Sequence, residues 1–163
     1  MPERLSLTES LYPVSVLAPA ADAGGRTGTW VNLAFSHKAY LVVFVNQGNA
    51  ATILLSLLQA TSAAGAGSKA AGTLGNAQIW ATLDAAGAPV FVRQTDGVTF
   101  TTDAGVKVKI VVFQMDPTDV LDLANGFTYV TVSTGASNSG NITSALLLQN
   151  LRFAGVAPPN LLT

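Results

Sequence analysis

The sequence predicts an all-β fold, an antiparallel β-sandwich of jelly-roll type, and three observations carry this prediction. Short segments rich in β-branched and aromatic residues recur along the 163-residue chain. Turn sequences with Gly, Asn, Asp or Pro separate them about every 8–12 residues, the spacing of an antiparallel sandwich or barrel. A helical signal occurs in one short stretch near 117–124, and no repeat of fixed length indicates a solenoid or propeller.

Three strands are expected in the first part of the chain. Residues 11–17 are expected to form a short strand, and Pro13 confines it to a sheet edge or falls at the strand's beginning, because proline cannot donate a ladder hydrogen bond. Residues 18–28 are rich in Ala, Gly and Asp and are expected to form a loop. An alternating strand covers 29–35, and a central strand, apolar on both faces, covers 39–45. The better core candidates of the alternating strand are Val31, Leu33 and Phe35, and the turn before the central strand holds His37 and Lys38.

Strands and turns continue to alternate through the middle of the chain. Residues 46–49 (NQGN) are a turn, and we interpret the apolar run 51–58 as a strand rather than a buried helix. Residues 60–76 are small, nearly uncharged and long for a loop in a compact domain. We expect this segment to be a surface excursion that becomes ordered against a neighbour. Further short strands are expected at 78–83, 89–94 and 98–102.

A strand, a short helical turn and a second strand follow. The first strand covers 106–114. Asp116 can accept hydrogen bonds from the first helical amides, and Pro117 fits the first helical position, where its missing N–H costs nothing. Asn125-Gly126 can end the helical turn as a C-cap. A strand at 127–133 follows, and this order is expected where a chain passes between the two sheets of a sandwich.

Extended arms are expected at both ends of the chain. Residues 1–11 show no sustained hydrophobic period, and the last strand covers 142–153. The tail contains Pro158-Pro159, which forbids regular structure there. We therefore divide the chain into an N-terminal arm (1–11), a β-sandwich domain (12–153) and an extended C-terminal tail (154–163).

The composition excludes several classes of function. The chain has no cysteine, so thiolate catalysis and zinc–thiolate sites are excluded. Its formal net charge of -1 argues against nucleic acid or acidic lipid as a partner, because both attract a basic surplus. The start MPERLSLTES has no apolar signal region, and the apolar runs are too short to cross a bilayer.

Charge is scarce in this sequence. Only 10% of the residues are charged and 49% are hydrophobic, whereas ordinary domains carry about 25% charged residues. We interpret this as the mark of a protein whose faces are covered in an assembly. Solubilisation by neutral polar residues and contact with a membrane surface are the two alternatives.

No pattern of catalytic or metal-ligating residues is present. The single histidine, His37, cannot form a zinc site alone and is interpreted as a turn residue. Asp116, Asp119 and Asp122 lack the ligand density of a calcium loop, and Gly65–Lys69 lacks the full spacing of a phosphate-binding loop. Asn141–Thr143 matches a glycosylation sequon but is interpreted as a chance match. The carboxylates outside the N-terminal arm are Asp22, Asp84, Asp96, Asp103, Asp116, Asp119 and Asp122, which are expected to serve turns and capping.

Four basic residues are associated with predicted strands. Lys107 and Lys109 alternate along one strand, and Arg93 and Arg152 lie near strand ends. We expect the two lysines to protect an exposed strand face by their charge. Contacts with an acidic partner surface are the alternative.

Three phrases of the sequence resemble a known group of proteins. They are NQGNAATILL (46–55), RQTDGVTFTTDAGVKVKIVVFQMDPTDVLDLANGFTYVTVSTGAS (93–137) and LRFAG (151–155). These phrases resemble small structural proteins of tailed bacteriophages that act as capsid decoration, or cement, proteins. The resemblance implies a jelly-roll-like homotrimer on the outside of an icosahedral shell, bound to the major capsid protein and clamping neighbouring capsomers.

The resemblance further implies a virion protein made in the bacterial cytoplasm, with no enzymatic activity, cofactor, metal or small-molecule substrate. It transfers no individual site residue. We expect residues 1–11, 60–76 and 154–163 to make the contacts with other subunits and with the shell. Two alternatives remain, a self-assembling coat protein and a carbohydrate- or receptor-binding module of a tail fibre. The aromatic candidates for such a module are Trp30, Trp80 and Tyr129.

Overall fold

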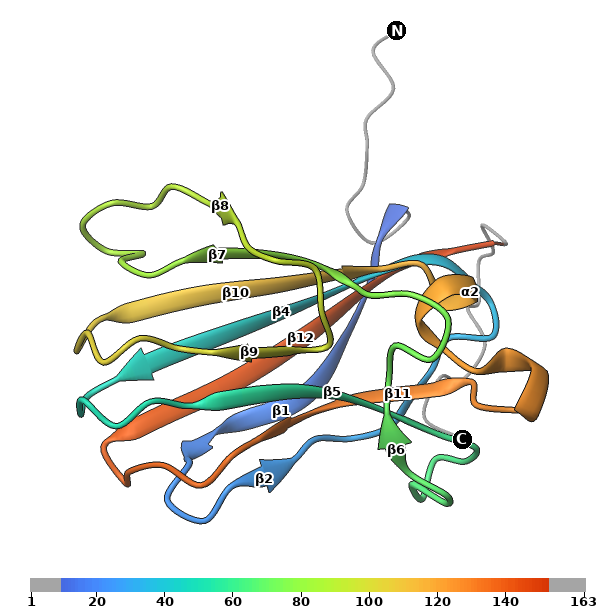
Figure 1. Cartoon of the computed structure of the whole chain (residues 1–163), viewed down its shortest axis with the longest axis horizontal. Coiled ribbons are helices and arrows are strands. Elements are labelled where there is room, and N and C mark those ends of the chain that lie inside the picture. The colour runs from blue at the N-terminus through green and yellow to red at the C-terminus, as the bar shows by residue number, and fades with distance from the viewer. Residues whose placement is uncertain (1–9, 153–163) are drawn as a thin grey trace, which may run out of the picture.

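The computed structural model describes residues 10–152, which form two antiparallel sheets packed face to face (Figure 1). The predicted all-β sandwich is therefore confirmed. The strands are β1 (Tyr12–Ala21), β2 (Arg26–Thr27), β3 (Val31–Asn32), β4 (Ser36–Gln47), β5 (Leu54–Ala60), β6 (Lys69–Ala70), β7 (Gln78–Thr82), β8 (Val92–Arg93), β9 (Thr99–Thr101), β10 (Val108–Met115), β11 (Tyr129–Thr134) and β12 (Asn141–Leu151). The helical elements are α2 (Pro117–Val120) and a 3₁₀ turn, η1 (Leu123–Asn125).

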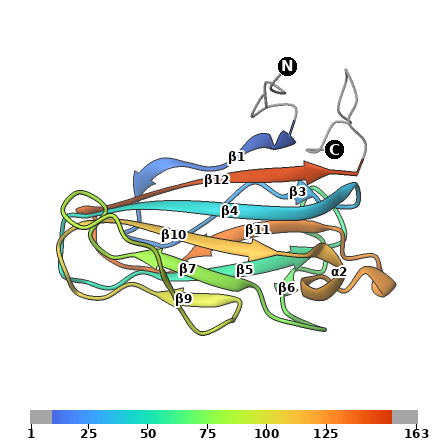
Figure 2. The ribbon, with the colours of Figure 1, turned by 90° about the horizontal axis from the view of Figure 1, so that it is seen from above.

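The strand pairing is nested in the manner of a jelly roll. Sheet A has the order β1-β12-β4-β10-β7-β8, which Figure 2 shows in sequence from β1 to β7. Sheet B has the order β2-β11-β5-β6, with β3 also paired to β11 and β9 to β5. The first strand thus pairs with the last, β2 and β3 with β11, β4 with β10, and β5 with β9. The strands β6 to β8 are an insertion within this scheme, and β7 and β8 widen sheet A.

The core lies between the sheets and follows strand alternation. On the central strand β4, every second side chain from Ala39 to Val45 is fully or almost fully buried. Antiparallel neighbours on both sides, β12 and β10, pair with β4 along most of its length. Because side chains alternate between the two faces of a strand, the intervening residues point away from the core. The expectation of a central strand is therefore confirmed, although only one of its two apolar faces is deeply buried.

The edge position of β1 is confirmed, but its predicted end is wrong. Pro13 pairs with Leu148 on β12, and β1 is the outermost strand of sheet A, so no strand on its other side requires a hydrogen bond from Pro13. The strand continues beyond the predicted 11–17 to Ala21, with two register shifts, and β2 also lies within the predicted loop 18–28. Pairing with β12 extends β1 through residues whose own sequence favours a loop.

Two further boundaries differ from the prediction at the start of β4. The predicted strand 29–35 is reduced to β3, and Phe35 is 42% exposed, whereas Val31 and Leu33 are buried as expected. His37 and Lys38 lie within β4 rather than in a turn. The long partner β12 pairs with β4 as far as Ser36 and so extends the strand over these polar residues.

The predicted helix near 117–124 is two separate elements. Its start is as predicted, since Asp116 accepts a 3.0 Å hydrogen bond from the Thr118 amide and Pro117 occupies the first turn. The helix ends after one turn, at Leu121, whose backbone is extended and whose side chain is fully buried in the core. The Asp122 amide then donates to Gln59 on β5, at 2.8 Å, instead of to a helical carbonyl. Gly126 caps the second element with a left-handed φ of 80°, as the sequence predicts.

The long connection 60–76 is mostly exposed, as expected of a surface excursion. It is partly ordered against its own sheet, because β6 pairs with β5 and Ala71 is buried. Residues 1–9 and 153–163, which contain most of both predicted arms, lie outside the described residues.

Candidate interaction surface at the loop end

Four connections gather at one end of the sandwich, at the left of Figure 1. They are the β4–β5 loop (48–53), the β7–β8 loop (83–91), the β9–β10 loop (102–107) and the β11–β12 loop (135–140). We call this the loop end. Its loops join different parts of the jelly roll, so side chains must hold them together if the end is to present a fixed surface.

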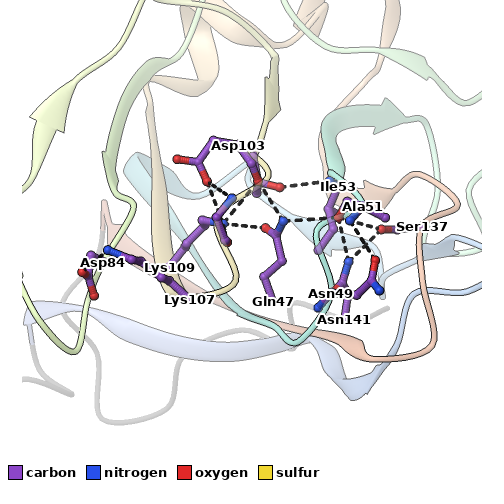
Figure 3. A network of polar contacts seen from close by, with 12 residues as sticks. Gln47, Asn49, Ala51, Ile53, Asp84, Asp103, Lys107, Lys109, Ser137 and Asn141 are labelled. Carbon is purple, nitrogen blue, oxygen red and sulfur yellow. Dashed lines mark hydrogen bonds and ion pairs between the residues drawn. The ribbon is translucent and has the colours of Figure 1, made fainter.

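Lys109 is the centre of the contacts beneath the loop end (Figure 3). Strand alternation places it on the core side of β10, where its side chain is 0% exposed. Its ammonium donates to Gln47 Oε1 at 2.7 Å, to the Asp103 carbonyl at 3.3 Å and to the Gly105 carbonyl. The Asp103 carboxylate lies 2.9 Å from the ammonium and completes an ion pair.

The predicted exposed position of Lys109 is therefore wrong. The Lys109 side chain lies on the core side of the sheet. The β9–β10 loop folds over its ammonium, which donates hydrogen bonds to carbonyls of that loop. Lys107 keeps the expected exposure, with 53% of its side chain accessible, but it lies just before β10 and not within a strand face. No acidic partner is needed to neutralise either lysine.

Gln47 joins the β4–β5 loop to the β9–β10 loop. Its amide nitrogen donates to the Asp103 carbonyl at 2.8 Å and to the Ala51 carbonyl at 3.3 Å. Its amide oxygen accepts from Lys109, and the residue is only 1% exposed. The amide oxygen and the amide nitrogen of this buried side chain are thus both hydrogen-bonded, which fixes the two loops relative to each other.

Asn141 joins the β11–β12 loop to the same structure (Figure 3). Its amide nitrogen donates to the Ala51 carbonyl at 2.8 Å and to Ser137 Oγ at 3.0 Å. Its oxygen accepts from the Asn49 amide at 2.8 Å. Asn141 is fully buried, so the sequon Asn141–Thr143 does not offer an accessible side chain for glycosylation.

The charges of the loop end are neutralised within the chain. Lys107 contacts Asp84 at 2.5 Å, and this hydrogen bond lowers the pKa of the carboxyl and raises the pKa of the ammonium. The hydrogen bond from Lys109 likewise lowers the pKa of Asp103. Both carboxylates are therefore fully ionised at neutral pH, and each is matched by a cation.

The same matching holds over most of the described chain. Within residues 10–152, five ion pairs are Asp22–Arg26, Asp122–Lys69, Asp96–Arg93, Asp84–Lys107 and Asp103–Lys109. The other charged residues of this range are Lys38, Asp116, Asp119 and Arg152. Asp116 and Asp119 belong to the α2 turn, and Lys38 and Arg152 lie close enough to Asp116 to lower its pKa. Figure 1 shows α2 at the end of the sandwich opposite the loop end. The loop end is consequently left without a net charge.

Large apolar side chains are exposed on the loops themselves. Val90 and Phe91 on the β7–β8 loop are 67% and 43% exposed, and Val106 on the β9–β10 loop is 57% exposed. The two loops are bound to each other by the Lys107–Asp84 pair and by a 2.8 Å hydrogen bond from the Ala85 amide to the Val108 carbonyl. The result is a partly apolar surface without net charge, held in place by hydrogen bonds and ion pairs and suited to contact with another protein.

The residues singled out for chemistry do not form a reactive centre. His37 is exposed on β4, and no cluster of metal-ligating residues occurs among residues 10–152. Lys69, at the end of the loop-like stretch Gly65–Lys69, instead pairs with Asp122 at 2.6 Å and lies 4.0 Å from the centre of the Phe127 ring. In the same part of the chain, no helix is long and apolar enough to cross a membrane.

The three candidate aromatics do not form one groove. Trp80 is on β7 in sheet A, next to Arg93 at 5.9 Å. Tyr129 is on β11 in sheet B, and Trp30 is nearly buried, with its indole against Gly65. A sugar-binding platform from these residues is therefore not assembled.

Comparison with known proteins gives no family assignment. No protein-family model matches the chain, and no curated protein matches it significantly.

Proposed function

We propose that this protein is a structural protein that binds the outside of a phage capsid and stabilises contacts between capsomers of the major capsid protein. The observation that carries the proposal is the loop end, whose charges are paired internally and which exposes large apolar side chains. Such a surface can bury itself against another protein without desolvating an unpaired charge. The sequence phrases that resemble decoration proteins supply the choice of partner.

The proposal includes a homotrimer with contacts from the arms and from residues 60–76. Each arm would bind at high effective concentration once the body of the protein is seated on the shell, so modest contacts add up to firm attachment. The predicted arms lie mostly outside the described residues, and their role rests on the sequence. We assign no catalytic residue, cofactor or small-molecule substrate in this proposal.

A matched pair of variants tests the role of the loop end. Phe91 and Phe35 are almost equally exposed, at 43% and 42%, but Phe35 lies at the opposite end of the sandwich. We expect Phe91→Asp to weaken binding to purified capsid shells about tenfold or more, because a charge would be buried in the contact. Phe35→Asp is expected to leave binding unchanged. Equal shell binding by both variants would contradict the assignment of the loop end.

Truncation in the same assay tests the arms. Removal of residues 1–11 or 154–163 is expected to weaken attachment to the shell while the far-ultraviolet circular dichroism stays that of the full chain. Undiminished binding after both truncations would refute the arm contacts. Formation of closed particles by the protein alone would replace the proposal with a coat protein.

A further inference from the structure

The outer face of sheet A carries apolar side chains where an antiparallel sheet exposed to water usually carries polar ones. On β4, the outward residues between Lys38 and Asn46 are Tyr40, Val42 and Phe44, and Phe44 is 43% exposed. Val42 is opposite Leu146 on β12 and opposite Val112 on β10. The same alternation continues the apolar surface across three adjacent strands.

The surface extends further along and across the sheet. Phe44 is opposite Ile110 on β10, and Trp80 on β7 is opposite Val112. Ile142 and Val108, each 40% exposed, lie at the end of the face nearest the loop end. We call this continuous surface the outer face of sheet A.

Sheet B gives an internal comparison, because its outer face has different chemistry. Ser133 on β11 is opposite Ser56 on β5, and Ser56 is opposite Thr99 on β9. Thr101 on β9 is opposite Leu54, whose large apolar side chain is exposed. The outer face of sheet B thus mixes Leu54 and Leu58 with Ser and Thr, whereas that of sheet A is mainly aliphatic and aromatic around Ser144. This difference indicates that the outer face of sheet A is covered in the working protein.

Charged residues occur only at the margins of the outer face of sheet A. Lys38 lies beyond Tyr40 towards α2, and Arg93 lies on the terminal strand β8, where it is paired with Asp96. Between these margins the outward positions of β4, β10 and β12 carry no charge. A face without charge can contact neighbouring copies around a symmetry axis with no like-charge repulsion, which a face of one sign cannot do.

The size of the face is of the order that association between copies needs. Four strands, β12, β4, β10 and β7, are each about 4.8 Å wide, and residues 108–114 of β10 rise about 3.3 Å each. The face therefore measures roughly 19 by 23 Å, or about 440 Å² in plan. Side chains that project from this plane raise the accessible area above this value, towards the roughly 600–1,000 Å² per partner of a specific interface.

We propose that the outer face of sheet A packs against a second copy of this chain. The inference deepens the assembly part of the proposed function, since it names the surface that joins the copies, and it leaves the loop end free for the shell. Apolar burial drives this association, and the internally paired charges do not oppose it. The proposal explains why the outward Val, Ile and Phe side chains gather on sheet A, whereas the outer face of sheet B places its leucines among Ser and Thr.

The test is the absolute mass in solution of the full chain and of three matched variants, by light scattering over a dilution series. Phe44→Lys and Ile142→Lys place a charge on the outer face of sheet A, whereas Leu54→Lys places one at a similarly exposed apolar position of sheet B. We expect the unmodified chain and Leu54→Lys to be oligomers, and both sheet A variants to fall to the mass of one chain, 16.7 kDa. Unchanged circular dichroism shows that the variants are folded.

Two results would overturn the inference: a monomeric unmodified chain, or sheet A variants that keep the mass of the oligomer. Binding to purified capsid shells, measured on the same samples, separates this inference from the proposed function. A monomer that still binds shells would refute the contact between copies and leave shell binding intact. A chain that forms the expected oligomer but does not bind shells would support this inference and refute the proposed function.

Discussion

Replacing Lys109 with methionine removes one buried charge and keeps a side chain of similar length. In the unmodified protein, the ammonium donates to Gln47 Oε1, the Asp103 carbonyl and the Gly105 carbonyl. The Asp103 carbonyl retains its bond from Gln47 Nε2 at 2.8 Å, so the acceptors that lose their donor are Gln47 Oε1 and the Gly105 carbonyl. The Asp103 side chain is 51% exposed and regains water.

The expected loss of stability follows from these two acceptors. A buried acceptor that loses its donor costs about 1–3 kcal/mol, and the half-buried Gly105 lies at the low end of that range. The exposed Asp103 side of the ion pair adds little, because solvent screens it. We expect Lys109→Met to lower the free energy of unfolding by about 3 kcal/mol, a large part of the 5–15 kcal/mol typical of a domain. For a protein of this size, that corresponds to a fall in Tm of about 6–12 °C.

Urea denaturation provides the measurement, and Lys107→Met is the matched control. Lys107 precedes Lys109 by two residues and pairs with Asp84 at the surface, where both partners are solvated. We expect the control to change the urea midpoint only slightly. In Lys109→Met the pKa of Asp103 should also rise towards its ordinary value, because the hydrogen bond from Lys109 is the main cause of its lowering. Equal losses of stability in the two variants would refute the view that Lys109 braces the loop end.

Two further predictions concern a glycine and acid stability. Gly65→Ala should destabilise the protein more than Gly126→Ala and should change tryptophan fluorescence, since a Cβ at Gly65 would lie 2.5 Å from Trp30 Nε1. Both glycines have left-handed φ values, 78° and 80°, but Gly126 has open space around it, so equal losses would contradict the packing argument. Acid should destabilise the fold, because hydrogen bonds lower the pKa values of Asp84, Asp103, Asp116 and Asp122. The folded state then binds fewer protons than the unfolded state, so the stabilisation is complete above about pH 4 and is lost as the pH falls through the lowered values. A urea midpoint that does not change from neutral pH to pH 2 would disprove this linkage.

Local signals in the sequence were sufficient for the fold class. A continuous apolar run identified the central strand β4, and alternation of lysines with β-branched residues identified β10, since both signals depend only on the strand itself. The cap by Asp116 and Pro117 and the left-handed Gly126 were also predictable, because each involves backbone groups within a few residues.

Pairing between distant segments decided the rest. The lengths of β1 and β4 depend on β12, which lies more than a hundred residues further along and extends both strands through loop-like or polar residues. The helix near 117–124 is divided for two reasons. The Leu121 side chain packs in the core, and the Asp122 amide donates its hydrogen bond to Gln59 instead of to a helical carbonyl. No short-range pattern carries this information.

The candidate interaction surface shows the same division most clearly. Sequence alone determined that charge is scarce and that Lys107 and Lys109, two residues apart, would lie on the same side of a strand. Only the tertiary structure decided that one lysine is exposed and the other is buried, because Gln47, the partner of Lys109, is 62 residues away along the chain. Burial of a polar side chain depends on which loops close over it, and that is fixed only when the two sheets have packed.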